Sequence, residues 1–247
     1  MDVAGRKILI TGGARGIGRR LAVKLAARNA RLVLVGRDGD RLRCLQAELG
    51  EETEIVACDL SQYEATDRLA ERVTADHPDL SVLVNNAAAQ AEMDFVEGCG
   101  AGHIAEARAE LSLNLAAPIA LAAALMPVMK RQPDAAIINV TTALALAPKK
   151  AAPVYCASKA GLRSFTQALR YQCRDDAAHV RVREVIMSLV NTDMTRGRGR
   201  GKISADAAAD AIVSAIEGDR DEVWVGKIRL LPLLVRLSPK TVQRMLR

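Results

Sequence analysis

Short apolar runs alternate with longer helical stretches along most of this chain, and this alternation constrains its fold more than any other feature. The expected strands occupy residues 7–10, 31–35, 54–58, 80–84, 136–140, 180–186 and 222–225. The expected helices run through residues 21–26 and over 41–49, 64–75, 104–130, 155–174 and 205–217. Regular alternation of this kind predicts an α/β fold, a doubly wound, mostly parallel seven-stranded sheet with helices on both faces.

The distribution of charge separates a neutral body from a basic tail. The chain of 247 residues carries 35 Lys and Arg against 29 Asp and Glu, a formal charge of +6. Residues 227–247 hold six basic residues and no acidic one, so residues 1–226 are balanced. Only 2% of residues are aromatic, whereas nucleic-acid binders usually combine a basic face with stacking aromatics. We therefore expect no nucleic-acid partner, and a core of small aliphatic side chains that suits a parallel sheet.

The cysteines and the apolar segments indicate a reducing compartment. Five scattered cysteines form no C-x-x-C pair, which predicts neither a zinc site nor a disulfide framework. The run at residues 8–10 is too short for a secretory signal, so we expect a cytoplasmic protein. Residues 111–129 carry no charge, but they contain Asn114 and two prolines. A buried helix is favoured there over a membrane span.

A glycine-rich turn lies between the first strand and the first helix. Its sequence, Thr11-Gly12-Gly13-Ala14-Arg15-Gly16-Ile17-Gly18, has the spacing T-G-x-x-x-G-x-G. Glycines let the backbone approach phosphates closely, and the helix N-terminus supplies free N–H groups. Strand-to-helix turns often use glycine for structural reasons alone, but this position is where a doubly wound fold binds a dinucleotide. We predict a dinucleotide site there.

The end of the second strand discriminates between the two nicotinamide dinucleotides. An NAD site usually has an acidic residue there to bond the ribose 2′-hydroxyl, whereas Gly36 and Arg37 follow the strand in this chain. Arg37, with Arg15 in the glycine turn, can bind a 2′-phosphate. Asp38 either faces solvent or pairs with Arg41. NADP(H) is therefore predicted in preference to NAD(H).

A phenol and an ammonium group are separated by one helical turn in Tyr155-Cys156-Ala157-Ser158-Lys159. Residues four apart share a helix face, and a nearby cation lowers a phenol pKa. Such a phenol can exchange a proton with an alkoxide. Among the three tyrosines, Tyr63 and Tyr171 have aspartate at that offset, so Tyr155 is the candidate.

These motifs together resemble the short-chain dehydrogenases/reductases over residues 5–226. We therefore expect residues 1–226 to form one Rossmann-fold dehydrogenase domain, followed by the tail at 227–247. The other motifs that carry the resemblance are Asp59-Leu60, Asn85-Asn86-Ala87-Ala88 and Asn114. It implies Tyr155 as general acid/base, Lys159 as the group that lowers its pKa and bonds the nicotinamide ribose, Asn114 as the holder of a relay water, and Thr142 as a substrate-oxygen ligand. It further implies cofactor contacts from Thr11, Gly12, Arg15, Gly16, Ile17, Gly18, Arg37, Asp59, Leu60, Asn86, Ala87, Tyr155, Lys159, Val190 and Thr192.

The chain departs from the family pattern at three places. Thr142 replaces the usual Ser, Ala88 ends a motif that normally reads N-N-A-G, and Met187-Ser188 replaces Pro-Gly before the nicotinamide contact. Asn114 could also simply bond a neighbouring backbone group, and Thr142 could simply end a strand. We expect a reductase or dehydrogenase acting on a carbonyl or alcohol, and the alternative is an NADP(H)-binding sensor or scaffold protein with weak or no catalysis.

Two segments have open roles. The loop at 195–204 alternates Gly and Arg and either closes over ligands or is simply solvated. The tail at 227–247 is apolar and basic, and it looks like the ending of DltE-type bacterial oxidoreductases. It is an arm that packs on a partner subunit or roofs the pocket, or else a segment making weak contact with a membrane surface. The family resemblance also implies a homo-oligomer, a dimer or tetramer, and no metal is expected.

Overall fold

All seven strands of the main sheet run parallel in this computed structural model, which describes residues 1–98, 100–197, 199, 201–226 and 228–246. The strand order is β3-β2-β1-β4-β5-β6-β9. The predicted seven-stranded, doubly wound sheet is therefore confirmed. The strands are β1 (Lys7–Thr11), β2 (Arg31–Gly36), β3 (Glu54–Ala57), β4 (Leu80–Asn85), β5 (Ala135–Thr142), β6 (Val180–Met187) and β9 (Glu222–Val225).

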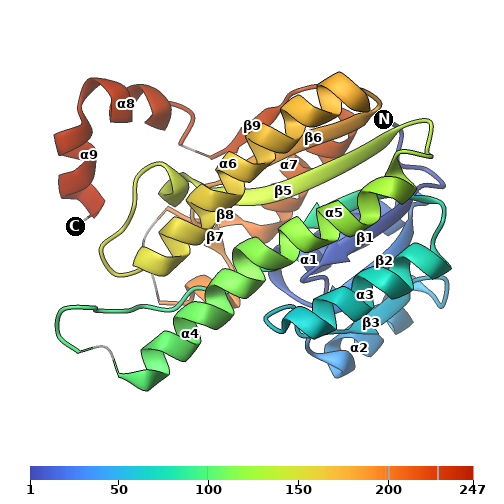
Figure 1. Ribbon diagram of the computed structural model, residues 1–247, viewed down its shortest axis with the longest axis horizontal. Coiled ribbons are helices and arrows are strands. Elements are labelled where there is room, and N and C mark those ends of the chain that lie inside the picture. The colour runs from blue at the N-terminus through green and yellow to red at the C-terminus, as the bar shows by residue number, and fades with distance from the viewer. Residues whose placement is uncertain (99, 198, 200, 227, 247) are drawn as a thin grey trace.

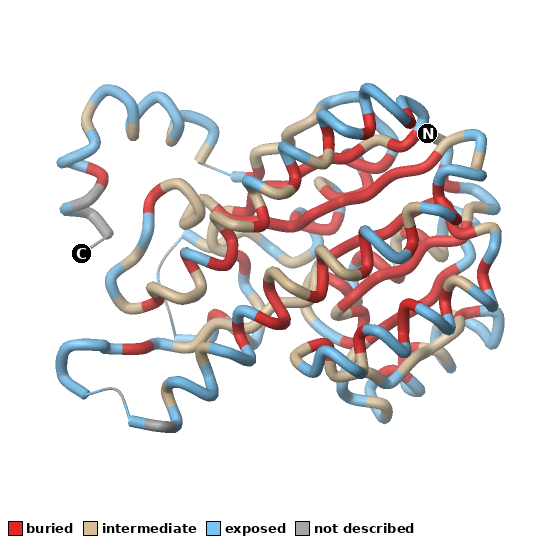
Figure 2. The backbone as a smooth tube through the Cα atoms, in the orientation of Figure 1, coloured by how far each residue is buried: buried red, intermediate tan, exposed pale blue. Residues whose placement is uncertain are grey.

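Helices cover both faces of the sheet (Figure 1). One face packs α1 (Gly16–Ala26), α2 (Gly39–Leu49) and α7 (Ala205–Glu217). The other packs α3 (Tyr63–Asp76), α5 (Ala117–Met129) and α6 (Pro153–Asp176). Successive residues of β1 contribute to opposite layers, Ile8 and Ile10 to the first and Leu9 to the second. Figure 2 shows the strands as the buried centre of this three-layered body. The near-continuous aliphatic runs are explained by burial on both faces.

The predicted helix at 104–130 is continuous but changes its winding in the middle. It consists of α4 (Ala101–Leu111), the π-helical turn η1 (Ser112–Ala116) and α5. Gly102–Met129 is apolar and long enough to cross a membrane, and half of its most apolar window is buried. Leu121 and Leu125 are inaccessible to solvent and lie in the core layer with α3. The buried side chains of α5 agree with the expectation of a buried helix rather than a membrane span.

The predicted loop at 195–204 and the segment that follows β5 contain short regular elements. In the loop at 195–204, β8 (Ile203–Ser204) pairs in parallel with β7 (Val190–Asn191), next to the 3-10 turn η3 (Asp193–Thr195). Arg198 and Arg200 of the Gly-Arg alternation lie outside the described residues. The turn η2 (Ala143–Ala145) follows β5. These short elements line up at the carboxyl ends of β5 and β6.

The tail forms two short helices after β9. They are α8 (Leu231–Leu237) and α9 (Pro239–Leu246), and Figure 1 shows both set apart from the sheet, at the end of the molecule farthest from the N-terminus. Pro232 and Pro239 stand at or near the first position of each helix, where a missing backbone N–H costs least. The prolines thus divide the tail into two helices.

The order of the strands determines where a ligand can bind. The chain leaves β3 at one edge, crosses through α3 on the opposite face, and returns as β4 beside β1. Helices that follow β1 and β4 therefore diverge to opposite faces and leave a crevice at the carboxyl ends of these strands. The crevice is the expected ligand position in this architecture.

Candidate active site

A cavity of about 680 Å³ opens at the carboxyl ends of the strands. It is lined along one side by the glycine turn and along the other by residues that end β5 and begin α6. Most of the sequence-predicted site residues line it: Gly12, Arg15, Gly16, Ile17, Arg37, Leu60, Asn86, Ala87, Thr142, Tyr155, Lys159, Val190 and Thr192. Thr11, Gly18, Asp59 and Asn114 do not. The side chains of Thr11, Asp59 and Asn114 make hydrogen bonds behind the wall, and Gly18 packs against the Gly12 carbonyl.

The glycine turn brings its backbone close to the cavity, beside the side chains of Ala14, Arg15 and Ile17. A Cβ on Gly18 would lie 2.1 Å from the Gly12 carbonyl oxygen, and one on Gly12 would lie 3.0 Å from Ala87 Cα. Gly12 and Gly16 also have positive φ angles, +69° and +55°. No described side chain caps the N-terminus of α1, which begins at Gly16. Free N–H groups and a close backbone approach fit the pyrophosphate of a dinucleotide.

Thr11 and Asn86 fasten this turn to β4. The Thr11 hydroxyl donates to the Val84 carbonyl at 3.2 Å and accepts from the backbone N–H groups of Asn86 and Ala87, each at 3.0 Å. The Asn86 amide donates back to the Thr11 carbonyl at 2.9 Å. Thr11 is buried and holds the two strand ends in register. It positions the glycine turn and does not itself line the cavity.

Two arginine side chains line the cavity near the end of β2. Arg15 and Arg37 are exposed, line the cavity, and make no ion pair among the described residues. Asp38 accepts from the Arg41 backbone N–H at 3.0 Å, which caps α2, and its carboxylate lies 3.1 Å from Arg41 Nε. Of the two readings of Asp38, pairing with Arg41 is therefore observed. Because the Asp38 carboxylate pairs with Arg41, both Arg15 and Arg37 remain available to bind an anion.

After β3, Asp59 shapes the loop. Its carboxylate accepts from the backbone and the hydroxyl of Ser61, at 3.0 and 2.8 Å. The neighbours Cys58 and Leu60 line the cavity in its place. The expected cofactor contact of Leu60 is compatible with this position.

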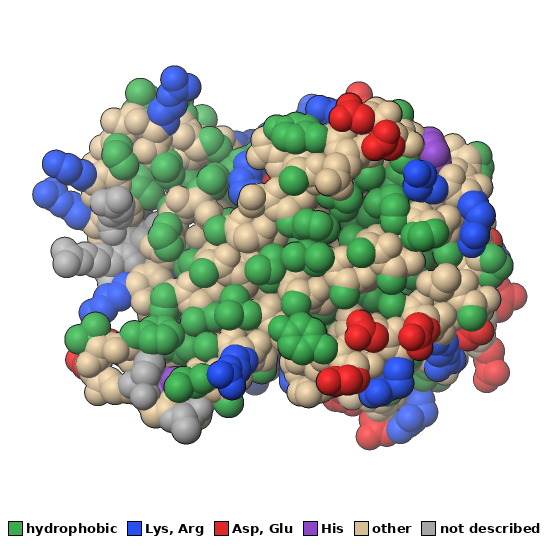
Figure 3. Space-filling model, viewed as in Figure 1, with side chains coloured by type: hydrophobic (Ala, Val, Ile, Leu, Met, Phe, Trp, Pro, Cys, Tyr) green, Lys and Arg blue, Asp and Glu red, His purple; other side chains and the backbone are tan. Residues whose placement is uncertain are grey.

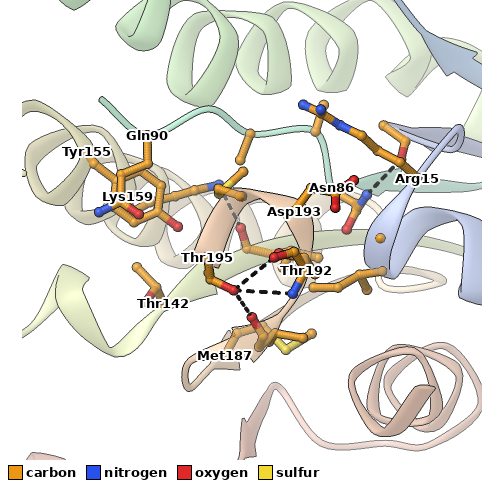
Figure 4. Close-up of a pocket in the computed structure, with 18 of the residues that line it drawn as sticks. Arg15, Asn86, Gln90, Thr142, Tyr155, Lys159, Met187, Thr192, Asp193 and Thr195 are labelled. Atoms are coloured by element: carbon orange, nitrogen blue, oxygen red, sulfur yellow. Dashed lines mark hydrogen bonds between the residues drawn. The ribbon is translucent and has the colours of Figure 1, made fainter. Parts of the chain in front are cut away.

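Three polar side chains converge at the far end of the cavity (Figure 4). Tyr155 and Lys159 lie one turn apart at the start of α6, and Thr142 ends β5. Lys159 is 2% exposed, and its Nζ donates to the Val140 carbonyl at 2.9 Å. The Thr142 hydroxyl accepts from the Leu144 N–H at 3.3 Å, so its own proton remains free to donate. The spacing of Tyr155 and Lys159 on one helix face is as predicted.

The electrostatics of this pair differ from the expectation. Burial raises the pKa of Tyr155 well above the ordinary phenol value, and the nearby Cys156 and Glu110 add to the rise. Burial also lowers the pKa of Lys159 to about 8, against a smaller opposing effect of Glu110. We expected Lys159 to lower the phenol pKa. Enclosure in the cavity outweighs that effect, since it disfavours both charged forms, and it leaves a protonated phenol.

The Asn114 side chain is bonded to backbone, which was the alternative considered for it. Its amide donates to the Ala89 carbonyl at 2.8 Å and its oxygen accepts from the Ala89 N–H at 3.0 Å. The amide also donates to the Ser158 hydroxyl at 3.1 Å. Asn114 lies within the π-helical turn η1, a form that often marks functional sites. It joins the loop after β4 to α6, directly behind Lys159.

Sequence reasoning missed a buried carboxyl group next to this site. Glu110 is 2% exposed, and one oxygen accepts from the Ala91 N–H at 3.0 Å. The other oxygen is buried and has no hydrogen-bond partner within the described chain. Burial raises the pKa of Glu110. The available signal was its position four residues before Asn114, which places both on one helix face. Together they brace the loop that carries Gln90 into the cavity.

A second buried network supports the wall behind Thr142. Glu184 in β6 is 2% exposed and bonds Thr141 and Arg163, the latter at 2.5 Å. Arg163 also bonds Glu222 of β9 at 2.8 Å and lies over the Trp224 ring, 5.5 Å from its centroid. These contacts join α6 to β6 and the edge strand. Nothing in the local sequence pattern linked these residues.

A doubly wound sheet with a backbone-lined phosphate turn and a Tyr/Lys pair in one cavity defines the class of dinucleotide-binding oxidoreductases. The family model for short chain dehydrogenase matches residues 6–202. The uncharacterised oxidoreductase DltE of Bacillus subtilis is 37% identical over 196 residues, which is 79% of this chain and 76% of that protein. The chain belongs to the short-chain dehydrogenase/reductase family.

Solved structures show the same fold. A short chain dehydrogenase from Burkholderia cenocepacia, crystallised in complex with NADP, is 27% identical with a TM-score of 0.86, and the match covers 100% of this chain and 99% of that chain. A relative from Burkholderia phymatum in complex with NAD has a TM-score of 0.84 at 22% identity, covering 100% of this chain and 97% of that chain. At that identity the second likeness shows the fold alone.

Proposed function

We propose that this oxidoreductase uses NADP(H) to interconvert a carbonyl and an alcohol, with Tyr155 as general acid/base. The observation that carries the proposal is the convergence of Tyr155, Thr142 and Lys159 in one cavity with the glycine turn. The cavity's remaining wall is largely apolar, with Leu113, Met187, Leu189 and Met194. This lining suits a substrate whose carbonyl is attached to an apolar group.

The cofactor would lie along the cavity from the turn to Tyr155. Gly12, Gly16 and the N-terminus of α1 would hold the pyrophosphate, and Arg15 and Arg37 would pair with a 2′-phosphate. Val190 and Thr192 would contact the nicotinamide end. The NADP bound to the Burkholderia cenocepacia relative supports this preference. Bound nicotinamide supplies or accepts a hydride at the substrate carbon.

The chain's own residues handle the substrate oxygen. The Thr142 hydroxyl donates a hydrogen bond to it and orients it. During reduction the Tyr155 O–H bond breaks and an O–H bond forms on the substrate, leaving a phenolate. The neighbouring Lys159 ammonium stabilises that phenolate. The raised pKa of Tyr155 keeps the phenol protonated, so it carries the proton that it would donate once charge develops on the substrate oxygen.

The test compares Tyr155→Phe with Tyr171→Phe, an exposed tyrosine on the same helix. We expect Tyr155→Phe to lower kcat on an identified carbonyl substrate by about 10²–10⁴-fold, with NADPH binding retained, and Tyr171→Phe to stay near wild type. Full turnover by Tyr155→Phe would refute the mechanism. NADPH binding without turnover on a broad carbonyl and alcohol panel would favour the sensor or scaffold alternative.

Cofactor preference has its own test. Titration of Trp224 fluorescence gives Kd for NADPH and NADH. Arg37→Ala should weaken NADPH by roughly tenfold, the scale of one lost charge-assisted bond, and leave NADH unchanged. Arg43→Ala, an exposed arginine of α2, is the control. Tighter binding of NADH than of NADPH by the wild type would contradict the assignment of Arg15 and Arg37.

We also propose a cytoplasmic homo-oligomer. The four described cysteines, Cys44, Cys58, Cys156 and Cys173, are all unpaired, as in a reducing compartment. Hydrophobic side chains gather over α4, α5 and α6 on one face (Figure 3), which fits packing through the long helices. Analytical ultracentrifugation tests this proposal, and a monomer at high protein concentration would refute it.

A further inference from the structure

The helix α8 exposes a row of leucines that nothing in the described chain covers. Leu230, Leu233, Leu234 and Leu237 have exposed fractions of 67%, 53%, 50% and 71%. They are spaced i, i+3, i+4 and i+7, so they share one side of the helix. We call this set the outer leucine face. The larger apolar side of α8 therefore points away from the body.

The opposite side of α8 is apolar as well. Leu231 and Val235 are half-buried there. A helix with apolar residues on most of its circumference is normally enclosed by protein or lipid. Solvent exposure of four leucines within residues 230–237 calls for a partner surface.

Charge identifies the partner. Arg229 and Arg236 are exposed beside the outer leucine face in sequence, Lys240 and Arg244 are exposed on the following helix α9, and residues 227–247 contain no acidic residue. Basic residues interleaved with exposed leucines complement the headgroups and acyl boundary of an anionic lipid surface. A symmetric contact with a second copy would instead bring the same cations together, because both copies use the same patch.

We propose that the outer leucine face docks on an anionic lipid surface and anchors the protein there reversibly. The leucines enter the acyl boundary, and the four cations contact lipid phosphates. The tail begins beside Ile228, which lines the active-site cavity. Docking therefore brings the cavity close to the lipid, where apolar carbonyl compounds partition.

The test is co-sedimentation of the full chain with vesicles of phosphatidylcholine, with and without phosphatidylglycerol. We expect the wild type to bind only the vesicles that contain phosphatidylglycerol, and binding to weaken as salt screens the cations. The double variant Leu233→Asn, Leu234→Asn should bind at least about tenfold more weakly. Each substitution removes the favourable free energy of transferring a leucine side chain from water to lipid. Arg236→Gln with Lys240→Gln should also weaken binding.

Two body variants serve as matched controls. Tyr63→Asn removes an exposed apolar side chain from α3, and Arg43→Gln removes an exposed cation from α2. Both should bind as the wild type does. No binding to phosphatidylglycerol vesicles, or equal binding by the leucine variant, would overturn the proposal. A third outcome would also overturn it: the wild type binds no vesicles but self-associates, and the leucine variant no longer does. A second copy of the chain would then cover the outer leucine face. These readouts do not depend on catalysis.

Discussion

At the scale of single residues, enclosure dominates the chemistry of the cavity. Tyr155, Lys159 and Glu110 each have a pKa displaced mainly by burial, and each is displaced toward its neutral form. The ordinary expectation from a Tyr/Lys pair considers only their mutual charge. The structure shows that both groups are also removed from water. This desolvation favours the neutral form of the phenol and of the amine.

Glu110 provides a test of this burial through stability. Its native pKa is raised, so the native state binds the proton more tightly than the unfolded chain does. The contribution of Glu110 to stability is therefore favourable at low pH and declines as pH rises above its ordinary value of 4.5. Glu110→Gln keeps an acceptor for the Ala91 N–H but carries no charge. We expect it to gain stability relative to wild type as pH rises from about 4 to 8.

Urea unfolding at several pH values measures this difference. Glu71→Gln, at an exposed glutamate of α3, is the control and should show no comparable trend. A constant difference between wild type and Glu110→Gln across the range would show that the native and unfolded states bind the Glu110 proton equally.

At the scale of elements, the first helix packs against the glycine turn with no spare room. Gly18→Ala would place a methyl group 2.1 Å from the Gly12 carbonyl oxygen, so the turn and α1 must separate. We expect a loss of about 1–3 kcal/mol in the free energy of unfolding, together with weaker dinucleotide binding. Gly102→Ala in α4 meets no atom within 4 Å and should be neutral or stabilising by up to about 1 kcal/mol. Equal effects of the two substitutions would contradict this packing.

Arg163 of α6 bonds both β6 and the edge strand β9. Arg163→Met would leave Glu184 buried without its cation, at a cost on the order of 3 kcal/mol near neutral pH. The same change at Arg174, which pairs with Asp221 at the surface, should cost less than about 1 kcal/mol. Burial raises the pKa of Glu184, so the cost of Arg163→Met should shrink as pH falls and the carboxyl takes up a proton. Denaturant midpoints at acidic and neutral pH measure it.

At the scale of the whole molecule, the tail is separable from the body. The sheet and its two helical layers are complete by Val225, and α8 keeps most of its surface in solvent. We expect a chain ending at Gly226 to unfold in one transition, with a midpoint close to that of the full chain. Circular dichroism and urea titration of both chains test this, and a large loss of stability would show that buried Val242 of α9 supports the core.

The order of elements and much of the candidate site could be predicted because both depend on local sequence. Aliphatic runs such as residues 7–10 and 31–35 form buried strands wherever helices cover both faces. The glycine spacing is required by one turn, and the Tyr155/Lys159 pair by one helix face. Cofactor and substrate chemistry followed from these local patterns and from family resemblance, and they remain proposals for this chain.

What the sequence could not indicate involves residues that meet only after folding. Glu110, Glu184 and Arg163 are charged side chains whose burial and partners come from distant elements. The change from a lowered to a raised pKa at Tyr155 has the same origin, because desolvation depends on every wall of the cavity. The basic, apolar tail was evident from composition. Only the tertiary structure determined that its leucines face outward, because their exposure depends on how α8 lies against the body.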